Sequence, residues 1–275
     1  MKSLLSCAAW IGLAVYAGGN PLLAQLRDNS EKQMTCDNGG NDGDRVRHCE
    51  IREQTMPAAG RLSVDASPNG GVSVKGWLRG EVLVRSRIDT SADTAATATA
   101  LARQVSIDGS AGQVQARGPE STNDASWNVS YEIFVPQATD LVLKTHNGGI
   151  TISDVRGQIQ FNAQNGGVHL RRVAGDVSGA TVNGGIQVEL TGAIWDGRQL
   201  EVSTTNGGVT LKTPAAYSAH IQAETHNGRI QSDFPMDVQG NLKPRQLDFN
   251  LGTGGALIHV HTENGSVRLE RAESQ

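Results

Sequence analysis

The sequence predicts an all-β protein, a right-handed β-solenoid-like stack of repeats with Asn-Gly-Gly corners, plus a short helix in the N-terminal part. The first observation is an Asn-Gly step that recurs along the chain. The second is its spacing of about 18–23 residues in the middle of the chain. The third is a strict alternation of apolar and polar residues on both sides of the step. The steps lie at Asn69, Asn147, Asn165, Asn183, Asn206, Asn227 and Asn264.

The alternation defines one repeat, which we call a rung: a strand that ends at an Asn, a corner, and a second strand. Because successive side chains of a strand point to opposite faces, matching positions of the rungs form columns. Two columns predicted to face inward lie six residues before and three residues after each Asn. The first contains Leu141, Ile159, Val177, Leu200, Ile221 and Ile258, and the second contains Ile150, Val168, Ile186, Val209, Ile230 and Val267.

Each residue type at the corner has an expected structural role. Asn-Gly tolerates the backbone conformations of a tight turn, and we expect the second Gly to avoid crowding the next layer. Aligned Asn side chains can form a hydrogen-bonded ladder between rungs. Thr two residues before the Asn can point inward and bond to the turn. It stands at Thr145, Thr181, Thr204, Thr225 and Thr262.

An alternative is a twisted antiparallel sheet or sandwich, in which Asn-Gly forms two-residue hairpins. Hairpins give no reason for the regular spacing, whereas a stack repeats the same corner in every rung. Asn227 and Asn264 are 37 residues apart, about two periods. The strand-like run Gln246 to Leu251 between them is therefore interpreted as a rung that lacks its Asn-Gly.

Before the repeats the pattern is less regular. Apolar alternation around Leu62, from Pro68 to Val74 and from Glu81 to Ile88 predicts three short strands, although the pattern before Asn69 is one residue out of phase. The Ala-rich run Asp93 to Val105 predicts a helix with Ser91 as its cap. Further strands are expected over Gln113–Arg117 and Ser126–Val135, and Pro136 precedes the repeats.

The N-terminus indicates export. Lys2 and a mostly apolar stretch from Leu4 to Ala17 predict a signal peptide over residues 1–24, with cleavage after Ala24. The stretch is too short to span a membrane. Lipid attachment at Cys7 is a poorer alternative, since the apolar stretch follows Cys7. The predicted mature chain has a disulfide-bearing segment (25–56), an N-terminal β part with one helix (57–136) and a repeat domain (137–273).

Two cysteines remain after this cleavage, and Cys36 and Cys49 are expected to form a disulfide in an exported chain. The acidic loop between them could offer oxygen ligands to calcium, but its spacing does not fit an EF-hand loop. A flexible acidic loop closed by the disulfide is the simpler interpretation. The oxygen ligands would be Asp37, Asn41, Asp42 and Asp44.

Several runs resemble the DUF4097 family of bacterial β-strand-repeat proteins, which are often labelled adhesins. The resemblance extends from Cys49 to Arg271 and implies the repeat fold. It implies no activity, cofactor or catalytic residues, since the family has no established activity. The runs are CEIRE (49–53), PNGGVSVKGW (68–77), WNVSYEIFVPQATDLVLKTHNGGITI (127–152) and LGTGGALIHVHTENGSVRL (251–269).

The outward columns were searched for chemistry. None collects paired carboxylates, which a polysaccharide hydrolase needs as acid and base, and no aromatic column could stack on sugars. His259 and His261 alternate onto one face of a strand, and with Glu224 on an adjacent rung they could hold a divalent metal. If the intervening segment forms an extra layer, they are instead two solvated histidines.

These observations favour an exported, non-catalytic β-repeat protein of the periplasm or cell surface, an adhesin-like binding or scaffold module without a cofactor. The expected partner is an envelope protein or a glycan, and exposed terminal strands also allow end-to-end self-association. A net charge of −4 gives no reason to expect a nucleic-acid partner. The alternatives are a carbohydrate-active β-helix enzyme, with Glu201 and Glu224 as acidic candidates, and a periplasmic sensor or regulatory partner.

Overall fold

The structure is a computed structural model that describes residues 34–36, 45–110, 112–234 and 245–272. The chain divides into two compact units, Met1–Met34 and Thr35–Gln275, and all described strands belong to the second. The predicted signal peptide and the acidic loop over residues 37–44 lie outside the described residues. Among the described residues, no helix has the length and apolar character needed to cross a membrane.

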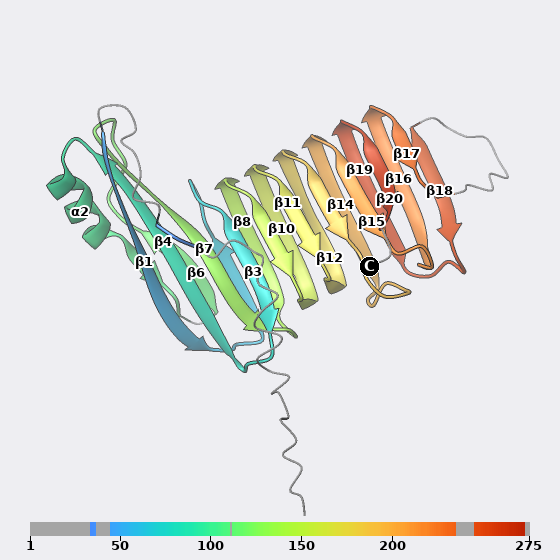
Figure 1. The fold of residues 1–275 in the computed structure, drawn as a ribbon, viewed down its shortest axis with the longest axis horizontal. Helices are drawn as coiled ribbons and strands as arrows, with labels where there is room; N and C mark the ends of the chain where they lie inside the picture. The colour runs from blue at the N-terminus through green and yellow to red at the C-terminus, as the bar shows by residue number, and fades with distance from the viewer. Residues whose placement is uncertain (1–33, 37–44, 111, 235–244, 273–275) are drawn as a thin grey trace, which may run out of the picture. The chain divides into compact units, whose positions relative to one another are not determined.

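The described strands form two sheets of ten strands each (Figure 1). The first sheet contains, in spatial order, β1 (Val46–Pro57), β4 (Glu81–Ala92), β7 (Ala125–Pro136), β3 (Val72–Trp77), β9 (Ile150–Ser153), β11 (Val168–Arg171), β13 (Ile186–Glu189), β15 (Val209–Thr213), β20 (Val267–Arg271) and β17 (Ile230–Ser232). The second contains β18 (Gln246–Leu251), β16 (Ala219–Asn227), β19 (Leu257–Asn264), β14 (Gln199–Asn206), β12 (Ala174–Asn183), β10 (Arg156–Asn165), β8 (Asp140–Asn147), β2 (Arg61–Asp65), β6 (Gln113–Arg117) and β5 (Ser106–Asp108). The helix is α2 (Ala95–Gln104).

Rungs stack by parallel pairing in both sheets. β10 pairs in parallel with β8 and β12, so that Asn165 lies opposite Asn147 and Asn183. After the corner, β11 pairs in parallel with β9 and β13, and Val168 lies opposite Ile150 and Ile186. The predicted all-β class with one helix is confirmed in the described residues. The handedness of the stack stays a prediction.

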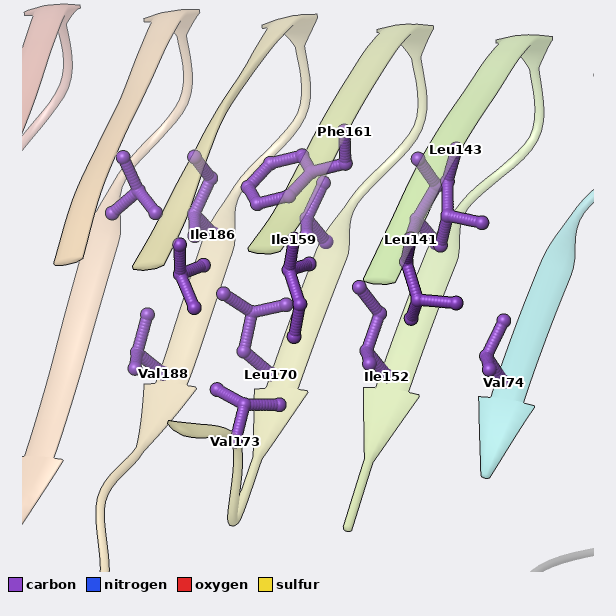
Figure 2. Packing of buried hydrophobic residues seen from close by; sticks show 14 of the residues in the cluster. Val74, Leu141, Leu143, Ile152, Ile159, Phe161, Leu170, Val173, Ile186 and Val188 are labelled. Atoms are coloured by element: carbon purple, nitrogen blue, oxygen red, sulfur yellow. The ribbon is translucent and has the colours of Figure 1, made fainter. Parts of the chain in front are cut away.

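The core lies between the inward faces of the two sheets. Figure 2 shows side chains of both sheets, among them Leu141, Ile152 and Ile186, packed against one another. The two inward columns predicted from the sequence are buried in the described rungs, apart from half-buried Ile230 on the short edge strand β17. Large and small residues complement each other here: a Cβ on Gly179 would lie 2.5 Å from the Phe161 ring. The glycine therefore provides the space that the ring fills.

The first Gly of each corner makes the closest approach to the backbone of a neighbouring rung. A Cβ on Gly184 would lie 2.1 Å from the carbonyl oxygen of Gly166, a distance that no side chain can accept. A Cβ on Gly185 would meet the nearest atom at 3.4 Å, an ordinary contact. The second Gly was expected to prevent crowding, and a Cβ on Gly149 or Gly208 would indeed lie only 3.0 or 3.1 Å from a carbonyl oxygen of the adjacent corner, but the first Gly makes the closer approach. Gly148, Gly166, Gly207, Gly228 and Gly265 have the same close approach as Gly184.

The corner threonines are buried and bond to the corner glycines. Thr181 Oγ1 donates to the carbonyl of Gly166 at 2.8 Å, and Thr204 Oγ1 donates to that of Gly184 at 2.8 Å. Thr262 and Thr225 bond in the same way to the adjacent corner. Ala163 has no hydroxyl, and the carbonyl of Gly148 is instead bonded by Thr145 of its own rung. The expected role of threonine is thus confirmed.

The asparagines form a continuous ladder on the outside of the corners. The side-chain amide of Asn165 donates to Asn147 Oδ1 at 2.8 Å, and that of Asn183 donates to Asn165 Oδ1 at 2.7 Å. The same bond links Asn147 to Asn69, Asn206 to Asn183, Asn264 to Asn206, and Asn227 to Asn264. Each rung therefore contributes one amide to a single chain of hydrogen bonds.

The rungs do not stack in sequence order at the C-terminal end. β19 lies between β14 and β16, and β20 lies between β15 and β17, so the last rung is inserted between two earlier ones. β18 pairs antiparallel with β16 at the edge of the second sheet. The interpretation of Gln246–Leu251 as a parallel rung between the Asn227 and Asn264 rungs was therefore wrong.

The N-terminal part shares both sheets with the repeats. β2 pairs in parallel with β8, and β3 with β9, so the sheets continue across the boundary placed at residue 136.

The phase shift before Asn69 has a simple cause. Asp65 lies opposite Lys144 and Asn69 opposite Asn147, which leaves one extra residue in the first rung. Burial raises the pKa of Asp65, but bonds from Ser67 and the Lys144 ammonium outweigh it and hold that pKa below its usual range.

The helix begins later than predicted. β4 continues to Ala92, where it pairs with Ala125 and Val46, so Ser91 lies in the strand. Thr94 is the cap instead, and its side chain accepts a bond from the Thr97 amide at 3.1 Å. The sequence analysis did not predict the long strand β1.

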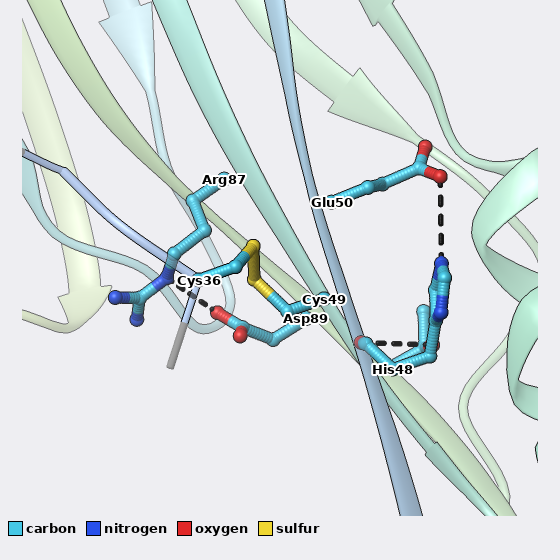
Figure 3. Close-up of a disulfide and its surroundings, with 7 residues drawn as sticks. Cys36, His48, Cys49, Glu50, Arg87 and Asp89 are labelled. Carbon is cyan, nitrogen blue, oxygen red and sulfur yellow. Dashed lines mark hydrogen bonds and ion pairs between the residues drawn. A yellow bond between two sulfur atoms is a disulfide. The ribbon is translucent and has the colours of Figure 1, made fainter. Parts of the chain in front are cut away.

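The predicted disulfide between Cys36 and Cys49 is present (Figure 3). It ties Cys36 to strand β1 beside the Arg87–Asp89 ion pair. Arg52 on the same strand donates to the carbonyls of Ala102 and Val105 at the end of α2, and so joins the helix to the sheet.

We predict that Gly184→Ala lowers the free energy of unfolding by more than about 3 kcal/mol, because the new Cβ would force adjacent corners apart. Gly185→Ala is the matched control, and its effect should stay within about 1 kcal/mol. Urea unfolding followed by circular dichroism measures both. Equal losses for the two variants would contradict the assignment of the first Gly as the packing residue.

We also predict that Asn183→Ala costs about 1–2 kcal/mol of stability, because it removes two ladder bonds at about 0.5–1 kcal/mol each. Asn227→Ala, at the end of the ladder, removes one bond and should cost about half as much. Both are compared with the wild type in the same urea titration. Equal effects of the two variants would show that the ladder adds no stability of its own.

Candidate functional site

The strongest candidate site is a shallow groove on the outer face of the first sheet, next to the corners. It crosses β11, β13, β15 and β20 and has a volume of about 370 Å³. Five of its nine lining residues carry polar side chains, and three are glycines. The lining residues are Gly167, His169, Gly185, Ile186, Gln187, Gly208, Thr210, Ser266 and Arg268.

One wall of the groove is a column of polar side chains, one from each rung. His169 lies opposite Gln187, Gln187 opposite Thr210, and Thr210 opposite Arg268. The column continues beyond the groove to Thr151 on β9 and Gln231 on β17. Since parallel strands lie about 4.8 Å apart, the wall presents a hydrogen-bonding group at about that interval.

The floor of the groove is made by the second Gly of successive corners. Gly167, Gly185 and Gly208 follow one another across the rungs, and Ser266 occupies the same position in the next rung. Exposed Arg229 occupies it in the edge rung, so this position accepts a side chain. A side chain is therefore tolerated at this position in two rungs, and the glycines of the other rungs leave the floor open to solvent.

Side chains beyond the groove are paired with one another. On the corner side lie the ladder asparagines. On the other side, the next outward residues form ion pairs, Arg171 with Glu189 at 3.3 Å and Lys212 with Glu270 at 3.4 Å. The groove therefore lies between a row of amides and a row of paired charges.

The predicted metal candidates lie on the outer face of the other sheet. Because β19 is inserted beside β16, His261 does lie opposite Glu224, and no extra layer separates them. His261 Nδ1 is 3.9 Å from Glu224 Oε2, and its Nε2 is 3.0 Å from Glu263 Oε1. His259 Nδ1 is 3.8 Å from Glu201 Oε1.

His261 thus lies near two carboxylates and His259 near a third. In the described ranges, no group of three His, Cys, Asp or Glu side chains is arranged to hold a metal ion. Glu201 and Glu224, the acidic candidates for an enzyme, lie on β14 and β16, with β19 between them. The metal site stays a prediction, and the groove is the better-formed feature.

A family model described as Toastrack DUF4097 matches residues 133–270, about half of the chain. The chain belongs to this family. The match begins near the end of β7 and ends in β20, and thus includes every rung from Asn147 onward. It is shorter than the resemblance from Cys49 to Arg271, so the N-terminal strands lie outside the Toastrack match.

Three solved structures resemble this chain at low sequence identity. A putative cell adhesion protein from Clostridium sporogenes is 11% identical, with a TM-score of 0.44 over 82% of this chain and 100% of that one. A putative adhesin from Parabacteroides merdae is 12% identical, with a TM-score of 0.36 over 85% and 98%. One from Bacteroides fragilis is 10% identical, with a TM-score of 0.31 over 81% and 97%. No curated protein matches the chain.

The wall residues of this Toastrack groove were expected to face outward, but the groove itself was not predicted. The wall residues are of different types, so no repeated residue marks this column in the sequence. The missed signal was the second Gly, which was assigned to packing. Its replacement by Ser266 and Arg229 in two rungs could have shown that packing does not require it.

Proposed function

We propose that this Toastrack protein is an exported, non-catalytic β-solenoid of the cell envelope that binds an extended glycan along its groove. One observation carries the proposal: successive rungs each contribute one polar side chain, at a constant interval, to a wall beside a floor made mostly of glycine. A long ligand lying across the rungs would meet an equivalent contact at each step. The affinity would then be the sum of weak, repeated hydrogen bonds.

The interval favours a sugar polymer over a peptide. Side chains on one face of an extended peptide repeat at about 6.6–6.8 Å, which does not match rungs about 4.8 Å apart. A linear polysaccharide presents hydroxyl groups on every sugar, and side chains such as Gln187 and Thr210 can both donate to and accept from hydroxyls. The groove thus suits the repeated hydroxyl groups of a polysaccharide better than the side chains of an extended peptide.

Export is supported by two features of the chain. The disulfide between Cys36 and Cys49 is typical of proteins that fold in an oxidising compartment. The N-terminus carries the predicted signal peptide. Periplasm and cell surface are both compatible with these features, and both contain extended glycans.

The non-catalytic part of the proposal rests on the carboxylates. A glycosidase places two carboxyl groups on either side of one bond, about 5–10 Å apart. Glu201 and Glu224 are two strands apart and two residues out of register, and each lies beside a histidine. They are therefore not arranged as a pair around a single bond.

Filling the floor should abolish glycan binding. Gly185→Gln places a side chain in the groove, where the added Cβ has an ordinary contact distance. We expect the Kd for soluble linear β-linked glucans and peptidoglycan glycan strands to rise at least about tenfold, measured by calorimetry. Product analysis of the same mixtures tests for catalysis.

The matched control is Ala180→Gln, which adds the same side chain on the outer face of the other sheet. Its Kd should stay within about twofold of the wild type. If the wild type binds glycans and both variants weaken binding equally, the binding site is not the groove. Binding of envelope proteins without binding of any glycan would contradict the ligand class.

A further inference from the structure

The last rung of the chain occupies a slot between two earlier rungs. We call β19 and β20 (257–271) the C-terminal rung. Its strand β19 is flanked by β14 and β16, and its strand β20 by β15 and β17. The two rungs that form the slot are complete before the C-terminal rung begins in the sequence. The slot is therefore filled by a segment that follows both of its walls in the sequence.

Both walls of the slot accept the C-terminal rung in the same register. Asn264 lies opposite Asn206 on one side and Asn227 on the other, and it bonds to both in the ladder. Inside, Ile258 lies opposite Leu200 and Ile221. The slot thus binds the C-terminal rung through backbone pairing and corner hydrogen bonds. These contacts are the same whether the rung and the slot belong to one chain or to two.

A single glycine-rich loop connects the C-terminal rung to the preceding chain. β18 and β19 lie on opposite sides of β16, so residues 252–256 cross the beginning of that strand. Gly252, Gly254 and Gly255 have φ values of +57°, +77° and +141°, a backbone that glycine adopts most easily. The Thr253 amide donates to Ser218 Oγ at 3.2 Å. Ala256 also accepts a bond from the His220 amide at 3.1 Å, and this loop is the hinge of the C-terminal rung.

We propose that the C-terminal rung is exchanged between copies of this chain, so that the slot of one copy binds the rung of a second copy. The exchanged pair makes every contact of the monomer except those of the hinge, so little free energy separates the two forms. The partner is a second copy because the slot already fits this sequence on both sides. Exchange would join two grooves in one molecule and increase its avidity for a repetitive ligand.

Disulfide trapping tests the exchange. Ser203 and His261 are half-buried, outward-facing and directly opposite on β14 and β19, a placement that suits a disulfide between neighbouring strands. A tagged chain with Ser203→Cys is co-expressed with an untagged chain with His261→Cys, both with Cys7→Ser. Exchange predicts a covalent heterodimer after oxidation, detected by tag capture and a non-reducing gel.

The control pair is Asn162→Cys with Ala180→Cys, which are opposite one another on β10 and β12, away from the C-terminal rung. This pair should give at least about tenfold less heterodimer. Equal yields from both pairs, or no heterodimer from the first pair, would overturn the proposal.

A second variant tests the hinge independently. Deleting residues 252–255 leaves one residue between Leu251 and Leu257, which spans at most about 7 Å, whereas β18 and β19 lie about 9.6 Å apart across β16. The C-terminal rung can then reach only the slot of another copy. Light scattering should then show a dimer in place of a monomer. A folded monomer of this variant would overturn the proposal. Neither measurement involves a glycan, so the result is separate from that of the groove experiment.

Discussion

The structure depends on the close backbone approach of neighbouring corners. The first Gly of each corner leaves no room for a Cβ against the carbonyl of the next corner, as Gly184 does against Gly166. This contact holds the rungs in one register, with every Asn opposite another Asn. The inward columns, the threonine bonds to the glycine carbonyls and the amide ladder then form from the same repeated geometry. One steric constraint thus organises both the core and the corner.

The same register creates the outer groove. Once the corners are aligned, the second glycines form a continuous floor and the residues two positions later form its wall. A surface built in this way has a constant interval and no deep pocket, which suits contact with a repeating polymer better than conversion of a small molecule. The exposed floor is the part of the corner that packing leaves free, as Ser266 and Arg229 show.

Much of this architecture could be predicted from the sequence, because periodic patterns report local geometry. The seven asparagines, the inward columns, the threonine bonds and the Cys36–Cys49 disulfide all followed from spacing and residue type. The order of the rungs could not be predicted. Any rung offers its neighbour the same Asn, Thr and apolar positions, so the pattern fits several orders equally well, and the insertion of β19 between β14 and β16 depends on tertiary contacts.

Two smaller errors have similar causes. Ser91 and Thr94 are both residue types that cap helices well. Thr94 is the cap because β4 stays paired up to Ala92, and this pairing cannot be read from the local sequence. The roles of the two corner glycines could not be separated from sequence alone, since both are consistent with a tight turn. Only the surroundings of each missing Cβ show that the first Gly lies much closer to the neighbouring backbone than the second.

The most direct test of the account is hydrogen exchange of the asparagine side-chain amides, measured by NMR with selectively labelled asparagine. If the corners are held in register, the amides of Asn165, Asn183 and Asn206 should exchange at least about tenfold more slowly than that of Asn123, an exposed residue outside the ladder. Exchange at the rate of Asn123 throughout would show that the corners are not aligned as described.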